Sequence, residues 1–392
     1  MAEYTASSAM LKALEAAGVT HLFVNLGSDH PAIMKAISKR KRDGKQGLKF
    51  ITAPNEFVGL CAAQGFFQAS GKMQAIIVHV DAGTLAMAGA LHNVSRARIP
   101  VIMIAGTSPV TDENELEFIH DIQDTIDQRW IVRNYTVLNH EIRTVRNVKQ
   151  LIHRAAQFSQ SAPQGPSYLI ASRETLEEEI PPYEVNPKKY RPLAPKVLDP
   201  GSVKEIGEAL INAKLPVVIT SPRDGLLEKA DVILVIDSDV PWIKSRFRPS
   251  PEALIYHIDA DPLKVNMSLF NIGADISAQA DAKTALEQIN QWLTQQKITT
   301  AQEEAVKKRT ANVSSIHDAY VADVVALQVV PEGDIITPHY VLSVLKKHID
   351  QDTLVLSEAI SNYCPVPDPG HEQPRLEEPH AQQPGGAQGR AL

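Results

Sequence analysis

The feature that most restricts the fold of this chain is a regular alternation of short apolar runs with helical patterns over residues 1–176. Residues 73–80 form one such run, and residues 99–106 form another after a segment rich in small side chains. Strands that are apolar along their whole length are typical of a parallel sheet covered by helices on both faces. We therefore predict an α/β fold made of doubly wound parallel-sheet domains.

Glu56 is the strongest candidate for a functional residue because of its position. An apolar run ends at Pro54, Asn55 is a favourable helix N-cap, and a helix rich in small residues is predicted to end near Gly71. Glu56 would then lie in the first turn of a helix, at the carboxyl end of a strand, where open α/β sheets bind ligands. Position alone does not separate a functional role from simple complementation of the helix dipole.

An ordered series of short motifs surrounds this position. They are Asn55-Glu56, Gln64-Gly65-Phe66, Ala69-Ser70-Gly71-Lys72, Arg98-Ile99-Pro100-Val101 and Ser161-Ala162-Pro163-Gln164-Gly165-Pro166. Taken in this order, residues 10–175 resemble the pyrimidine-binding domain of thiamine-diphosphate-dependent enzymes. The nearest group contains acetolactate synthase, benzoylformate decarboxylase and 2-hydroxyacyl-CoA lyase.

This resemblance implies a cofactor, thiamine diphosphate, and a catalytic role for Glu56. In the family, this Glu hydrogen-bonds N1′ of the aminopyrimidine and promotes loss of the proton from thiazolium C2, and the activated cofactor attacks a carbonyl compound. A carboxyl group serves this purpose when apolar walls raise its pKa enough for it to share a proton. The resemblance also implies an active site between two subunits and cofactor contacts at Gly27, Gly83 and Thr107.

The loops after the predicted strands depart from the family pattern. Gly27 and Gly83 are kept, but Thr107 stands where many relatives have Gln, and Ala86 stands where Asn is usual. Substrate and reaction type are therefore left open. The candidate residues of a changed substrate pocket are Ser28, His79, Asp81, His92 and Asn93. Each is equally compatible with an ordinary buried or surface polar group.

Further domains are expected after the pyrimidine-binding-type domain at residues 1–176. Residues 177–200 are rich in proline and charge and predict a linker to a shortened Rossmann-like middle domain at 201–293. No glycine-rich phosphate loop is present there, so FAD is not expected. Only the ten residues 221–230 separate two of its predicted parallel strands, which favours an internal deletion over a compact variant.

Residues 294–364 resemble a linker helix followed by the start of the family's third, diphosphate-binding domain. Residues 365–392 lose all periodicity and are expected to be disordered. The family holds its diphosphate through Mg²⁺ bound by a Gly-Asp-Gly motif, and this motif does not occur in the sequence. We therefore expect no metal ligands in this chain, and weak cofactor binding through pyrimidine contacts alone.

Composition argues against several classes of partner. A net charge of −7 is unfavourable for nucleic-acid binding, and no apolar window is long enough to cross a membrane. Two cysteines, Cys61 and Cys364, do not make a disulfide framework, and the N-terminus lacks a targeting pattern. These features predict a cytoplasmic protein.

Two functions stay open from the sequence. The first is a thiamine-diphosphate-dependent lyase or carboligase acting on a 2-oxo acid or a related carbonyl substrate, as a homo-oligomer or together with a full-length relative. The second is a catalytically incompetent, truncated homologue or regulatory subunit that pairs with such a relative. A plain nucleotide-binding α/β protein is a weaker alternative, because a phosphate loop is missing.

Overall fold

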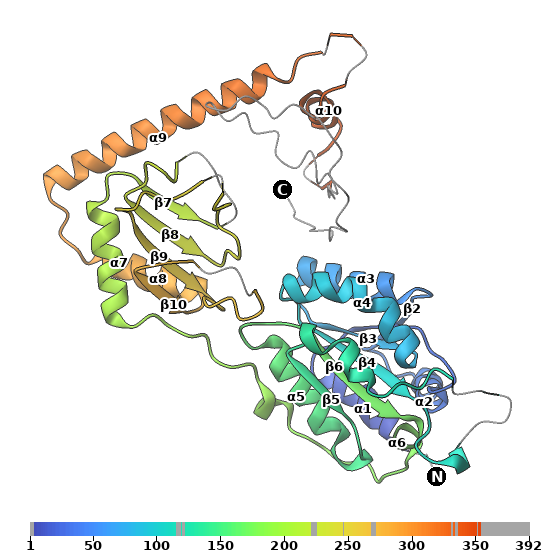
Figure 1. The fold of residues 1–392 in the computed structure, drawn as a ribbon. Coiled ribbons are helices and arrows are strands. Elements are labelled where there is room, and N and C mark those ends of the chain that lie inside the picture. The colour runs from blue at the N-terminus through green and yellow to red at the C-terminus, as the bar shows by residue number, and fades with distance from the viewer. Residues whose placement is uncertain are drawn as a thin grey trace. The chain divides into compact units, whose positions relative to one another are not determined.

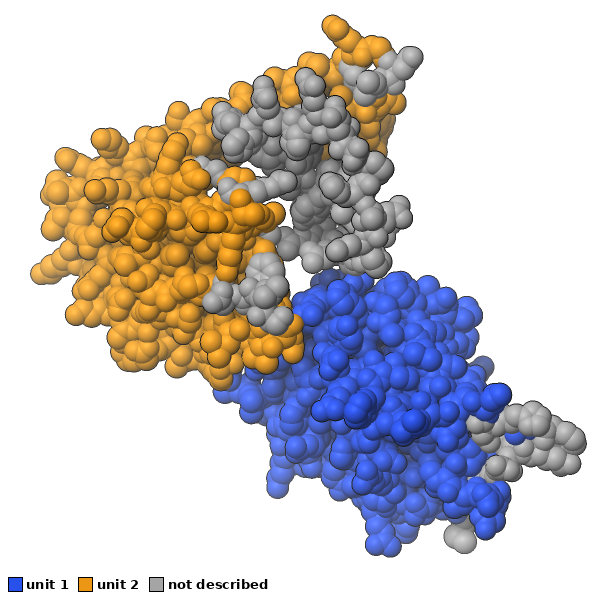
Figure 2. All heavy atoms as spheres, in the orientation of Figure 1, with its two compact units in different colours: residues 1–194, 386–389 blue, residues 195–385, 390–392 orange. Residues whose placement is uncertain are grey.

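The structure is a computed structural model, and it describes residues 4–353 except 115–118, 120–121, 221–225, 246, 268–271, 331, 334–335 and 351. The chain divides into two compact units, the first ending at Ala194 and the second beginning at Pro195 (Figures 1 and 2). This division falls within the segment 177–200 that is expected to be a linker.

The first unit is built on a six-stranded sheet in which all neighbouring strands are parallel. Its strand order is β2-β1-β3-β4-β6-β5. The strands are β1 His21–Val24, β2 Lys49–Thr52, β3 Gln74–Val78, β4 Val101–Thr107, β5 Leu138–Glu141 and β6 Ser167–Ser172. The predicted doubly wound α/β fold is confirmed, and the strand order reverses between β1 and β3.

Helices cover both faces of this sheet (Figure 1). On one face lie α1 Ala6–Ala16, α2 Pro31–Arg42, α5 Val148–Gln160 and α6 Arg173–Glu177; on the other lie α3 Glu56–Ser70 and α4 Val80–Arg96. Successive side chains of a strand point to opposite faces, so Ile76 packs in the core under α3 and α4 while Ile77 packs in the core under α1 and α2. This is why β3 is buried along its whole length.

Short 3₁₀ helices occur in the connections of this unit. They are η1 Asp112–Asn114, η2 Gln128–Ile131, η3 Arg133–Tyr135, η4 Val145–Asn147 and η5 Pro187–Tyr190. Of these, η2 packs against α4, and Val132, which follows it, belongs to the core under α3 and α4.

Helix α4 begins earlier than the sequence pattern predicts. The pattern extends the strand to Val80 and places a loop at residues 81–84, but β3 ends at Val78 and the helix starts at Val80. The chain turns within two residues because His79 is an extended N-cap and Val80 has a left-handed φ of 36°. Residues 81 and 83 consequently lie in the first turn of a helix.

The second unit contains a four-stranded parallel sheet in the order β10-β9-β8-β7. Its strands are β7 Pro216–Ile219, β8 Val232–Ile236, β9 Leu254–Asp259 and β10 Ile276–Gln279, and its packed helices are α7 Pro200–Asn212 and α8 Ala282–Thr294. Both helices cover one face, while Leu227, Trp242 and Ile272 from connecting segments cover the other. Residues 222–225, where the sequence suggested a join, lie outside the described residues.

Two helices follow this sheet. Helix α9, Thr300–Ala326, is 27 residues long, and none of its side chains is buried. Helix α10 spans Pro338–Leu345. The expected disordered tail at 365–392 lies outside the described residues. In the part of the chain that the structure describes, no helix has both the length and the apolar character needed to cross a membrane.

Candidate functional site

The point where the strand order reverses brings two loops together. The chain leaves β1 at Val24 and β3 at Val78, and the backbone N–H of Asn25 still bonds the carbonyl of Ile77 at 2.9 Å. Crevices at the carboxyl ends of strands, at such a reversal, are where open α/β sheets bind ligands. Most of the residues proposed from the sequence gather here.

Glu56 is the first residue of α3, as predicted. The side chain of the N-cap, Asn55, accepts a hydrogen bond from the N–H of Val58 at 3.2 Å. Glu56 Oε1 accepts a hydrogen bond from Asn25 Nδ2 at 2.8 Å, which joins the start of α3 to the end of β1. A Cβ at Gly83 would lie 3.2 Å from this oxygen and 3.0 Å from Val78 Cβ, so the glycine keeps the approach to Glu56 open.

Asp29, in the loop after β1, is the centre of a second cluster at the same edge. It is 4% exposed, and its Oδ1 accepts a hydrogen bond from His79 Nδ1 at 2.7 Å. His30 Nδ1 lies 2.9 Å from the same oxygen. The backbone N–H of Val80 donates to Oδ2 at 3.2 Å. One carboxylate thus joins the loop after β1 to the start of α4.

Two glycines leave the space that this cluster fills. A Cβ at Gly27 would stand 2.2 Å from His79 Nδ1, and a Cβ at Gly106 would stand 1.9 Å from Asp29 Oδ2. Real Cβ atoms do not approach other atoms so closely. The pairing of Asp29 with His79 therefore requires glycine at both positions.

Hydrogen bonds set the charges of the pair. Burial by itself would raise the pKa of the Asp29 carboxyl, but hydrogen bonds and charge from His30 and His79 outweigh it and hold the pKa at about 2. The hydrogen bond to Asp29 raises the pKa of His79, burial opposes this, and the charges of Asp29, Asp81 and Glu56 add to the rise. The pairing therefore keeps Asp29 ionised and stabilises the protonated form of His79.

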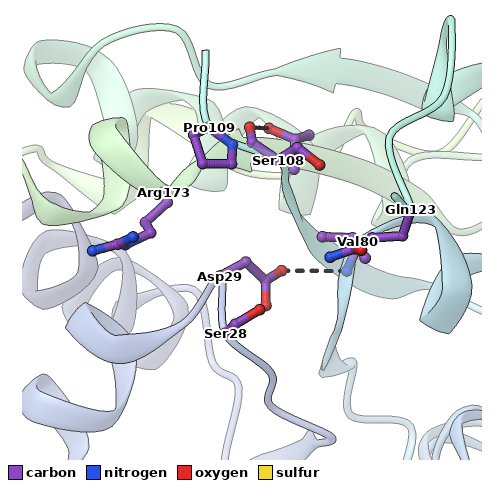
Figure 3. A pocket seen from close by; sticks show the side chains of 8 residues that line it. Ser28, Asp29, Val80, Ser108, Pro109, Gln123 and Arg173 are labelled. Atoms are coloured by element: carbon purple, nitrogen blue, oxygen red, sulfur yellow. Dashed lines mark hydrogen bonds between the residues drawn. The ribbon is translucent and has the colours of Figure 1, made fainter. Parts of the chain in front are cut away.

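A small pocket opens next to this pair (Figure 3). Figure 3 shows the Asp29 carboxylate directed toward the backbone of Val80, with Ser108 and Pro109 across the pocket. Ser28 and Thr107 line it too, together with Gln123 and Arg173. Four strand ends (β1, β3, β4 and β6) thus contribute to one pocket, through residues near 28, 80, 107 and 173.

A buried network supports the strained start of α4. Thr84 Oγ1 donates to the carbonyl of Val80 at 2.8 Å and lies 2.7 Å from the hydroxyl of Tyr168. Gln128 Nε2 donates to the same hydroxyl at 2.8 Å and to the carbonyl of Gly106 at 3.1 Å. Burial raises the pKa of the Tyr168 phenol, so it stays neutral. The network fixes the backbone on which His79 and Asp29 depend.

Three of the proposed substrate-pocket residues have other positions. Asp81 is in the first turn of α4, and its Oδ1 is buried without a hydrogen bond among the described residues. His92 lies twelve residues, about 18 Å, further along α4 than Val80 and packs its ring against Tyr135. Asn93 adjoins it, with its Oδ1 3.3 Å from His92 Nδ1. The structure does not bring His92 or Asn93 to the cluster.

Sequence reasoning missed Asp29, His30 and Gly106. Asp29 and His79 are fifty positions apart, and no motif within either loop indicates their pairing. The one available signal is that a Ser-Asp-His run follows a predicted strand, at the edge where ligands bind.

Within the described ranges, no group of three or more His, Cys, Asp or Glu side chains is arranged to hold a metal ion. The described residues thus bring together no such donor set for Mg²⁺.

Comparison with known proteins gives a family match to the N-terminal part of the chain. Residues 4–131 match the family described as thiamine pyrophosphate enzyme, N-terminal TPP binding domain. The chain is 23% identical over 218 residues to benzoylformate decarboxylase of Pseudomonas aeruginosa, which covers 56% of this chain and 39% of that protein. It is 21% identical over 304 residues to 2-hydroxyacyl-CoA lyase of Saccharomyces cerevisiae, covering 64% of this chain and 53% of the lyase. The chain thus spans about half, or less, of these relatives.

Solved structures show the same fold. The crystal structure of benzoylformate decarboxylase from Polynucleobacter necessarius superposes with a TM-score of 0.66 at 19% identity, covering 91% of this chain and 71% of that one. A thiamin diphosphate-dependent enzyme from Mycobacterium smegmatis gives a TM-score of 0.60 at 18% identity, covering 76% and 63%. Residues 4–131 thus match the N-terminal TPP binding domain of thiamine pyrophosphate enzymes, and the solved structures share the fold of the chain.

Proposed function

We propose that this chain carries the cofactor-activating part of a thiamine-diphosphate-dependent lyase or carboligase acting on a 2-oxo acid or a related carbonyl substrate. The observation that carries the proposal is the position of Glu56. Glu56 lies at the start of α3, beside the reversal in strand order. Asn25 donates a hydrogen bond to its Oε1, and Gly83, which has no side chain, lies in front of it.

The residues present fit the pyrimidine end of this cofactor. Asn25 donates a hydrogen bond to Glu56 Oε1, so Oε2 is the oxygen that would share a proton with the aminopyrimidine. Gly83 has no side chain to fill the space beside this carboxylate, where its Cβ would lie 3.2 Å from Oε1, and Gly27 and Thr107 border the same edge. When bound, the cofactor supplies the carbon nucleophile that attacks a carbonyl group.

Ser28 and His79 are the side chains that we assign to the substrate, and Asp81 has a supporting role. Ser28 lines the pocket, and His79 brings positive charge within a few residues of it. A 2-oxo acid carries a carboxylate beside its ketone, so a cationic donor in the pocket suits this class of substrate. Asp81 would act indirectly, by holding charge on His79.

The remaining parts of the site would come from elsewhere. Because the chain spans about half the length of its curated relatives, we propose that a full-length copy or partner chain supplies the diphosphate end. The chain would form a homo-oligomer or pair with such a full-length relative. A cytoplasmic location remains part of the proposal.

Calorimetric titration of thiamine diphosphate, with and without Mg²⁺, into the purified 392-residue chain tests the proposal. We expect binding that Glu56→Gln weakens at least about tenfold, because a charge-assisted hydrogen bond contributes roughly 1.5–3 kcal/mol. Glu303→Gln is the matched control, since Glu303 also stands in the first turn of a helix, α9, but in the second unit. Equal losses in both variants, or no binding by the folded chain, would rule the proposal out.

A further inference from the structure

Asp29 has more hydrogen-bond partners than any residue that the sequence analysis proposed for the substrate pocket. Both of its oxygens are occupied, Oδ1 by His79 Nδ1 and Oδ2 by the N–H of Val80. His30 is fully buried, and its Nδ1 lies 2.9 Å from Oδ1 while it accepts a hydrogen bond from the Gly27 N–H at 3.2 Å. A buried carboxylate with this set of donors is fixed in place and cannot rotate toward a ligand.

This arrangement limits how His79 can bind a ligand. Its Nδ1 is committed to Asp29, so Nε2 is the only ring nitrogen that can bond to a ligand. The imidazole side chain is 30% exposed, in contrast to 3% for Asp29. The ring is therefore partly accessible at the edge where Glu56 also stands, and Nε2 is the nitrogen that Asp29 does not bond.

Charged groups from three elements face this imidazole. Asp29 contacts it from the loop after β1, Asp81 acts from the first turn of α4, and Glu56 acts from the start of α3. The His30 ring lies 6.5 Å away, centroid to centroid. These three carboxylates raise the pKa of His79 above its ordinary value, although burial opposes them.

Two glycines indicate that the fold provides the space for the pairing of Asp29 with His79. Gly27 and Gly106 come from different strand ends, and a methyl group at either would overlap His79 or Asp29. The φ of 36° at Val80 is a strained conformation for a β-branched residue, and it directs the Val80 N–H to Asp29.

We propose that Asp29 is the positioning residue that holds His79 as an imidazolium whose Nε2–H hydrogen-bonds an oxygen of the carbonyl substrate. This inference rests on the proposed function for the identity of the substrate. Asp29 itself touches no ligand. The substrate class that fits is an oxo acid with an ionised carboxylate, because a cationic donor favours an anionic oxygen over the neutral oxygen of the corresponding ester.

The first test is an NMR pH titration of the histidine rings in the full chain, without cofactor. In the wild type we expect His79 to titrate above the ordinary value of about 6.5 and its neutral form to keep the proton on Nδ1. A titration at or below that value, or a neutral ring protonated on Nε2, would overturn the assignment without any variant.

Asp29→Asn removes the charge and keeps the size of the side chain. We expect it to lower the His79 titration midpoint by about 1–3 pH units, the usual effect of losing an adjacent opposite charge. His92, on the same helix but outside the cluster, is the internal control and should not move. If Asp29→Asn does not fold, Gly27→Ala tests the same contact, because its Cβ would displace the His79 ring. An unchanged His79 midpoint in a folded variant would refute the role of Asp29.

Benzoylformate and its methyl ester then serve as probes of the substrate contact in the chain loaded with thiamine diphosphate. We expect benzoylformate to shift the His79 Nε2 resonance, the ester to shift it far less, and Asp29→Asn to weaken the benzoylformate response at pH 7. Equal responses to both probes would overturn the anionic contact. A chain with the expected titration that binds no thiamine diphosphate would instead overturn the proposed function, which separates the two failures.

Discussion

Asp29 is a carboxyl group on which two physical effects act in opposite directions. Removal from water favours its neutral form, whereas hydrogen bonds from two imidazoles favour its charged form and win. The hydrogen bond between Asp29 and His79 also raises the pKa of that imidazole, so each partner favours the charged form of the other. A buried group of this kind links the stability of the fold to pH.

We predict that stability passes through a maximum between the two titrations of this pair. The pKa of Asp29 falls from 3.8 to about 2 on folding, so its contribution, about 2 kcal/mol, is complete above pH 3.8 and is lost as pH falls toward 2. The pKa of His79 rises on folding, so its contribution is complete below 6.5 and is lost as pH rises through the folded value. Urea unfolding at a series of pH values measures both limbs.

Asp29→Asn is the control for this dependence, since it removes both limbs at once. If the wild type and Asp29→Asn show the same pH profile of unfolding free energy, other groups determine the pH dependence and the prediction is wrong.

Two glycine substitutions give a matched test of the packing around the same carboxylate. Gly106→Ala should destabilise the chain by about 1–3 kcal/mol, because its Cβ would meet Asp29 Oδ2 at 1.9 Å in a packed interior. Gly65→Ala, on α3, should instead stabilise it by about 0.5–1 kcal/mol, because nothing lies within 4 Å of its Cβ and alanine favours a helix. Thermal unfolding of both variants measures the change in stability. Changes of similar size and the same sign would contradict this account of the packing around Asp29.

The site was predictable where its signals are local and unpredictable where they are not. Asn55, Glu56 and Gly71 mark the ends of α3 through capping chemistry that acts within a few residues, so their positions could be read from the sequence. Asp29 acquires its role only from His79, fifty residues away, and from space left at Gly106. No pattern within one loop carries that information.

At the scale of elements, the boundary between β3 and α4 shows where pattern reading fails. Hydrophobic periodicity marks Val80 as part of a strand, because a buried valine after an apolar run has no other local signature. The helix starts there because the hydrogen bonds from Thr84 and to Asp29 stabilise a backbone conformation that valine alone would avoid. Tertiary contacts override the local preference by placing donors and acceptors at one turn.

The opposite case is α3, whose start depends on a cap. We predict that Asn55→Ala lowers the free energy of unfolding by about 1 kcal/mol, because the N–H of Val58 loses its acceptor. Asn55→Asp should retain most of the stability, since aspartate caps equally well. Chemical denaturation followed by circular dichroism measures the difference, and equal losses in both variants would show that the side chain acts through something other than capping.

At the scale of the whole molecule, each unit has its own cores. The two hydrophobic clusters of the first unit contain only residues up to 183, and the two of the second contain only residues from 198 onward. The class of fold was readable from the sequence because alternation of strands and helices repeats along the chain. The direct pairing of β7 with β8 was not, since the short connection between them argued for missing elements.

We predict that Gly207→Ala disturbs the second unit alone. Its Cβ would stand 2.3 Å from the ring of Trp292, at the contact between α7 and α8. The expected result is earlier thermal loss of Trp292 packing, seen by fluorescence, with His79 resonances unchanged at 25 °C. Gly201→Ala is the control on the same helix, because its nearest neighbour, Asp199 Oδ1, is 3.0 Å away on the tip of a side chain at the surface. Perturbed His79 resonances in Gly207→Ala would contradict independent cores.

The left-handed backbone at Val80 affects which substitutions at this position selection for heat resistance could accept. Asparagine tolerates that conformation better than a β-branched residue does, but position 80 is 2% exposed, so its amide would have to find a buried partner. That amide would also stand beside Asp29, to which the backbone N–H of residue 80 already donates. Laboratory evolution toward a more heat-resistant chain is therefore expected to gain stability elsewhere and to leave this strained valine in place.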